Sequence, residues 1–195
     1  MNAFTIQTLF LLYSALSILA AGMIAALFWH KKDTSARIWI VSCLLTSLAT
    51  VVTVNRDIIP LIISYSLMVS FEALSLFLLS ESIKRLNPQK NHIGISHLTW
   101  LLPSLLFVIV EYDRYQAQGE LTASMTAATA IICGFANLYC FYQTRLVSKY
   151  FKHQLFFNFI GLSVLVVGLL YALRTINVLT AYSQYAFDLK SYNLA

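Results

Sequence analysis

Charged residues are scarce in this sequence. Only 11% of its 195 residues are charged, whereas about a quarter of the residues in an average soluble domain are. So few charges cannot cover the water-facing surface of a soluble protein, and the apolar share of 59% exceeds what one buried core holds. The composition therefore predicts a membrane protein.

The chain also lacks the residue patterns of common catalytic and cofactor sites. It contains no glycine-rich phosphate loop, no HExxH motif and no GxSxG motif. Its three cysteines lie inside apolar stretches without paired spacing, so we expect neither a disulfide framework nor a zinc site. The histidines fall in the connections or at the ends of apolar stretches, and no lysine lies within one, which argues against haem and against a retinal Schiff base. We therefore expect no enzyme activity, no metal and no cofactor.

What the chain does contain is six apolar stretches separated by short polar connections. At about 1.5 Å per residue, a helix needs about 20 residues to cross a bilayer core, and backbone polar groups in lipid must pair within their own segment. We predict an all-α polytopic bundle with six transmembrane helices, over residues 4–29, 38–54, 58–83, 95–110, 121–146 and 155–181. Short connections make consecutive helices antiparallel neighbours.

The basic residues predict how this bundle is oriented. Nine of the thirteen lysines and arginines lie in or beside the first, third and fifth connections. Such loops face the cytoplasm, so we expect the N-terminus and residues 182–195, a polar tail, to lie outside. Because the basic residues lie in short loops and not along a solvated face, the expected partner is the lipid bilayer and not nucleic acid. Two interpretations of the tail remain open: a complete six-helix protein, or a chain that continues into a seventh helix.

Glu72 is the one carboxylate that we expect well inside the membrane. It comes fourteen residues after Ile58, about 21 Å along the helix, where a carboxylate must be protonated, paired or hydrated. Tyr65 and Ser75 share its helical stripe, and Asn137 on the fifth helix lies at a similar depth. We predict a Glu72–Asn137 hydrogen bond, which serves either as a polar contact between helices or as part of a ligand or proton site.

A second candidate site is expected at the outer ends of the helices. Arg174 and Asn177 lie near the end of the sixth predicted helix, and Arg56 and Asp57 lie before the third. Two interpretations are open: Arg174 extends to the lipid headgroups, or these side chains form a polar ligand site open to the outside. Pairs of small residues such as Gly22 and Ala26 permit close helix packing, either within the bundle or between the subunits of a homodimer.

Parts of the sequence resemble a recurring membrane region of bacterial signalling proteins. Three segments carry the resemblance: Arg56-Asp57-Ile58-Ile59-Pro60, the basic helix end Lys84-Arg85, and Tyr171-Ala172-Leu173-Arg174. They are similar to the N-terminal multi-helix sensor regions of diguanylate cyclases with GGDEF domains and of membrane histidine kinases. The resemblance implies a location in the bacterial inner membrane, an extracellular or membrane-borne signal such as a small molecule, and a cytoplasmic signalling domain or partner.

These observations favour a sensory or signal-transduction function, in which a signal changes how the helices pack. Two alternatives remain open. One is a small proton- or cation-coupled transporter or channel that uses Glu72, and the other is a structural membrane subunit.

Overall fold

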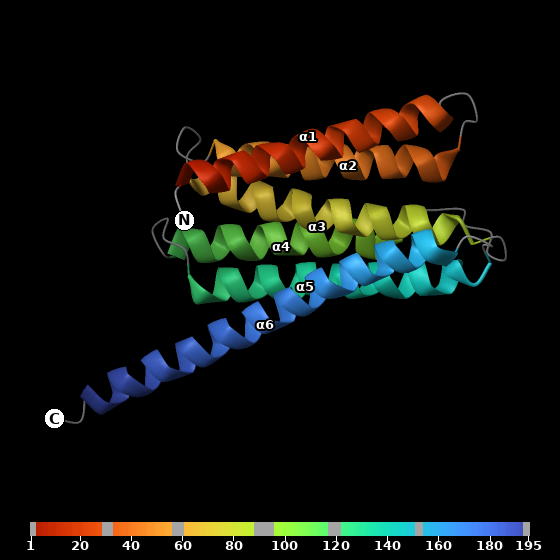
Figure 1. The fold of residues 1–195 in the computed structure, drawn as a ribbon. Helices are drawn as coiled ribbons and strands as arrows, with labels where there is room; N and C mark the ends of the chain where they lie inside the picture. The colour runs from red at the N-terminus through yellow and green to blue at the C-terminus, as the bar shows by residue number, and fades with distance from the viewer. Residues whose placement is uncertain are drawn as a thin grey trace.

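The computed structural model describes residues 3–28, 33–55, 61–87, 96–116, 122–150 and 154–192. Within these ranges the chain forms six helices and no strand, so the predicted all-α bundle is confirmed (Figure 1). The helices are α1 (Ala3–Phe28), α2 (Thr34–Val54), α3 (Leu61–Arg85), α4 (His97–Gln116), α5 (Ala123–Ser148) and α6 (Gln154–Tyr192).

Three helices differ from their predicted bounds by four residues or more at one end. Helix α2 begins at Thr34 and not at Ile38, because the side chain of Asp33 caps it by accepting a hydrogen bond from the Ser35 backbone N–H at 2.8 Å. Helix α4 continues to Gln116 through charged residues that hydropathy alone places in a loop. Helix α6 continues to Tyr192, so most of the predicted tail is helical.

Five of the six helices are long and apolar enough to cross a membrane, which makes this a multi-pass membrane protein. Within the described residues, α4 does not reach the same hydropathy, because Glu111, Asp113 and Arg114 lie in its last two turns. A crossing by α4 and an outward-facing N-terminus therefore stay predictions.

Helices α3 and α5 form the centre of the bundle. Over half of the apolar span of α3 is buried (56%) and half of that of α5, against 11% for α1 and 12% for α6. Helix α3 packs against α2, α4 and α5, whereas α1 packs against α2 and α6 packs against α5 (Figure 1). The main core lies between α3, α4 and α5, where Phe77 is 1% exposed and its ring lies 6.3 Å from that of Phe135 and 6.4 Å from that of Tyr139.

Serine side chains connect the first three helices. The hydroxyl oxygens of Ser14 on α1 and Ser47 on α2 are 2.6 Å apart. Between α2 and α3, Ser35 Oγ donates to the Ser82 carbonyl at 2.7 Å, and Ser82 Oγ donates to the Ser35 carbonyl at 2.9 Å. Small polar residues let helix backbones approach closely and supply hydrogen bonds where lipid offers none, so hydrogen bonds connect α1 to α2 and α2 to α3.

Glycines allow a similarly close approach between α5 and α6. A Cβ atom added to Gly168 would lie 3.3 Å from Asn137 Cβ, and one added to Gly134 would lie 3.3 Å from Tyr171 Cβ. A side chain at either position would therefore require its neighbour to shift by a few tenths of an ångström. A Cβ atom on Gly22 would meet nothing within 4 Å, so the small residues around Gly22 do not make a tight contact in the bundle, and a homodimer through them stays a prediction.

Candidate binding cavity

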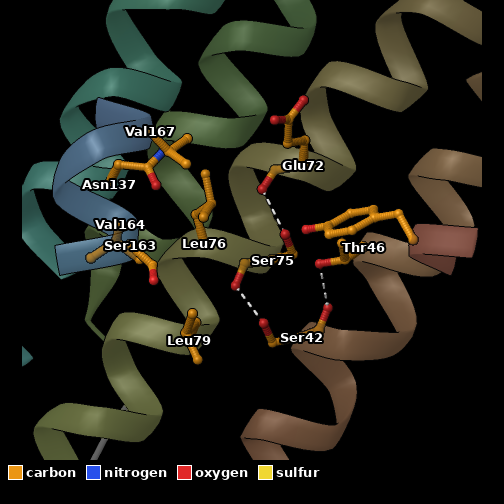
Figure 2. Close-up of a pocket in the computed structure, with 11 residues that line it drawn as sticks. Ser42, Thr46, Glu72, Ser75, Leu76, Leu79, Asn137, Ser163, Val164 and Val167 are labelled. Atoms are coloured by element: carbon orange, nitrogen blue, oxygen red, sulfur yellow. Dashed lines mark hydrogen bonds between the residues drawn. The ribbon is translucent and has the colours of Figure 1, made fainter. Parts of the chain in front are cut away.

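A cavity of about 270 Å³ lies against α3, between the α1–α2 side of the bundle and α6 (Figure 2). Five helices contribute to its lining. The lining residues are Tyr13, Ser42, Thr46, Glu72, Ser75, Leu76, Leu79, Asn137, Ser163, Val164 and Val167.

Glu72 lies at one end of this cavity, with its carboxylate turned away from Ser42 (Figure 2). It comes eleven residues after Leu61 and thirteen before Arg85, which places it about 17 Å and about 20 Å from the two ends of α3. Glu72 is therefore close to the middle of this helix, where an unpartnered carboxylate would be costly.

The phenol of Tyr171 on α6 supplies a partner, since its hydroxyl donates a hydrogen bond to Glu72 Oε1. This contact joins two helices whose backbones do not pack against each other: among the described residues, no Cα atom of α6 lies within 8 Å of a Cα atom of α3. A long side chain on each helix bridges the gap. The Tyr171–Glu72 hydrogen bond thus connects α3, at the centre of the bundle, directly to α6.

The predicted Glu72–Asn137 hydrogen bond is wrong. Asn137 Nδ2 donates to the carbonyl of Cys133 on its own helix at 2.8 Å, and the partner found for Glu72 is Tyr171. An asparagine within a helix can reach the carbonyl four residues earlier, so Asn137 did not need a partner on α3. The two side chains still line the same cavity.

The other predicted residues on the α3 stripe have different surroundings. Ser75 lines the cavity, is 2% exposed and donates to the Glu72 carbonyl at 2.7 Å. Tyr65 does not line it, and instead packs against the core cluster of α3, α4 and α5. The structure thus places Ser75 with Glu72 in the cavity lining and leaves Tyr65 outside that lining.

The predicted outer cluster remains a prediction. Arg56 and Asp57 lie outside the described residues, as does the side chain of Arg174. Asn177 is exposed on α6 and lies beyond the cavity lining.

Sequence reasoning missed Tyr13, Ser42, Thr46, Ser163 and Tyr171 as residues of this region. A signal was present for two of them, since Ser42 and Thr46 are four residues apart and fall on one stripe of an otherwise apolar helix. No such spacing marks Tyr171, because its role depends on how α6 crosses the bundle.

The sequence also did not predict that a second carboxylate on α3 is buried. Glu81 is fully buried, with its oxygens 3.3 Å from Lys84 Nζ and 3.8 Å from Arg85 Nε. Its place near the basic end of the helix suggested a membrane-surface position. The side chains of Lys84 and Arg85, one turn later, are also largely covered and lie beside the carboxylate of Glu81. Protein therefore covers this end of α3.

No protein-family model, curated protein or solved structure matches the chain. Among the described residues, no group of three or more histidine, cysteine, aspartate or glutamate side chains is placed to hold a metal ion. The function is therefore inferred from the helix arrangement and the cavity.

Proposed function

We propose that this protein is a membrane sensory module in which occupancy of the cavity is transmitted as a movement of α6. The observation that carries the proposal is the Tyr171–Glu72 hydrogen bond, which connects α6 to α3 at the cavity although the two helices do not pack together. A ligand that contacts Glu72 competes with Tyr171 for the same carboxylate. Occupied and empty cavities then favour different positions of α6, and such a difference is what signalling requires.

The geometry of α6 suits a lever. It is one helix of 39 residues, about 58 Å long, and it crosses the bundle obliquely before extending beyond it (Figure 1). Its close contact with α5 lies at Gly134 and Gly168, near Tyr171. A small rotation about this contact displaces both ends of α6. In the predicted orientation the Gln154 end faces the cytoplasm, where a signalling domain or partner in a bacterial inner membrane would respond to it.

The proposal predicts that Tyr171→Phe changes the position of α6. Spin labels at Val51 on α2 and Ile176 on α6, both exposed sites, report the separation of these helices in lipid nanodiscs, with Cys43 replaced by alanine. Because the variant loses the hydrogen bond to Glu72, we expect the distance distribution to broaden and its mean to shift by a few ångströms. Pulsed electron–electron double resonance measures both the mean distance and the width of its distribution.

The matched control is Tyr142→Phe, which removes a hydroxyl from a tyrosine that is 57% exposed on α5. Its distance distribution should equal that of the parent protein. An unchanged distribution in Tyr171→Phe would mean that α5 alone holds α6, and the sensory proposal would fail.

A proton- or cation-coupled transporter is the second candidate, because Glu72 is a half-buried carboxylate in the middle of an apolar helix. This alternative predicts ion flux across proteoliposomes that Glu72→Gln abolishes. The sensory proposal predicts that flux with the parent protein equals that with Glu72→Gln and that of protein-free liposomes.

A further inference from the structure

The hydroxyl groups that line the cavity on α2 and α3 donate their protons to backbone carbonyls. Ser42 Oγ donates to the Ser75 carbonyl at 2.7 Å, and Thr46 Oγ1 donates to the Ser42 carbonyl at 3.1 Å (Figure 2). Ser75 Oγ donates to the Glu72 carbonyl at 2.7 Å. A hydroxyl has one proton to donate and two acceptor positions, so each of these oxygens is left with acceptor capacity.

The side chains across the cavity follow the same rule. Ser163 Oγ on α6 donates to the Phe159 carbonyl at 2.9 Å. Asn137 Nδ2 donates to the Cys133 carbonyl at 2.8 Å. This contact fixes the amide orientation, because Oδ1 has no proton to donate to a carbonyl. Asn137 is only 1% exposed and its amide points into the cavity (Figure 2), so the cavity is where its Oδ1 is accessible. No described residue donates to that oxygen.

Glu72 adds a carboxylate to this set of acceptors. A carboxylate accepts hydrogen bonds through two oxygens when ionised, and Glu72 accepts one from Tyr171. Apart from Tyr13, whose hydroxyl can both donate and accept, the polar lining therefore combines neutral acceptor oxygens with one acidic group. Such a lining disfavours an anion and favours a ligand whose polar group donates several hydrogen bonds. A primary ammonium group is the simplest, since it has three donors and no acceptor.

The rest of the lining is apolar, and the cavity opens towards the side of the bundle. Leu76, Leu79 and Val164 cover its inner wall. At its rim, Tyr13 on α1 and Val167 on α6 are 54% and 41% exposed, and α1 does not pack against α6 in the described residues. Both helices expose apolar side chains to the bilayer. A ligand that enters between them must therefore carry an apolar chain that partitions into the bilayer.

We propose that the cavity binds a primary amine carrying an apolar chain, which enters from the bilayer. Its ammonium group donates hydrogen bonds to Asn137 Oδ1 and to neighbouring hydroxyl oxygens of the lining, and its chain packs against Leu76, Leu79 and Val164. The role of this ligand as a signal rests on the sensory function proposed above, whereas its binding does not.

Binding of n-hexylamine to the protein in nanodiscs of neutral lipid tests the assignment. Calorimetry at neutral pH should show saturable binding beyond the partitioning measured with empty nanodiscs. The anion n-hexanoate, which has the same chain length and the opposite charge, should not bind. Asn137→Leu should weaken n-hexylamine binding about tenfold, the loss of one hydrogen bond to a charged group. Ser42→Ala, a smaller change, should weaken it by a factor of about three.

The matched control is Asn158→Leu, which alters an exposed asparagine on α6 outside the cavity and should bind n-hexylamine as the parent does. The assignment is overturned if binding is no greater than partitioning, if n-hexanoate binds equally, or if Ser42→Ala and every folded variant at Asn137 bind like the parent. Specific binding that leaves the Val51–Ile176 distance unchanged supports the amine site and contradicts the sensory function. The two proposals can therefore fail separately.

Discussion

Replacing Phe77 with alanine should lower the free energy of unfolding by about 2 kcal/mol. Phe77 is 1% exposed and lies at the centre of the α3–α4–α5 core, beside the rings of Phe135 and Tyr139. In a soluble protein this change typically costs about 3–5 kcal/mol, which includes transfer of the ring to water. In a membrane the unfolded helices remain in lipid, so the free energy of transferring the ring to water does not contribute. The loss of packing around the space that the ring leaves still does.

Unfolding in mixed micelles with increasing denaturing detergent measures this free energy. The control is Leu101→Ala on α4, where the leucine is 62% exposed and the same measurement should change by less than about 0.5 kcal/mol. Equal losses at Phe77 and Leu101 would contradict the placement of the core between α3, α4 and α5.

Gly168→Leu should separate α6 from α5, with a stability loss of about 2–3 kcal/mol. Even a Cβ atom at this position would lie 3.3 Å from Asn137 Cβ and 3.4 Å from Leu138 Cδ2. Asn137 cannot yield cheaply, because it is buried and bonded to Cys133. The larger side chain therefore has to push the helices apart. Detergent unfolding measures the loss, and the Val51–Ile176 distance reports the displacement of α6.

Gly22→Leu provides the control, because the side chain would project from α1 into open space. It should leave both the stability and the helix separation unchanged. If Gly168→Leu behaved like Gly22→Leu, the close contact between α5 and α6 would be contradicted.

Hydropathy was sufficient to predict the helices because a bilayer allows few alternatives for long apolar stretches. It was less reliable at the helix ends, which depend on local chemistry. The cap from Asp33 starts α2 early, and the charged end of α4 remains helical where water would satisfy the side chains. Residues 182–192 carry no strong apolar pattern, yet α6 includes them.

Helical periodicity likewise predicted part of the site. Depth and spacing brought Glu72, Ser75 and Asn137 to one cavity. They did not identify the partner of Glu72, because a partner on another helix depends on crossing angle and axial separation, which a single sequence does not specify. The cavity lies where α6 does not pack against α3 in the described residues, and so Tyr171 acquires its role from the fold and not from its own sequence context.

We propose that the Tyr171–Glu72 hydrogen bond holds α6 in place, and a double-mutant cycle on the Val51–Ile176 distance tests this most directly. Tyr171→Phe and Glu72→Leu each remove one side of the same contact, so the account predicts that both variants shift the distance alike and that the double variant shifts it no further. Shifts that add in the double variant would show that the two side chains act independently, and would contradict the account.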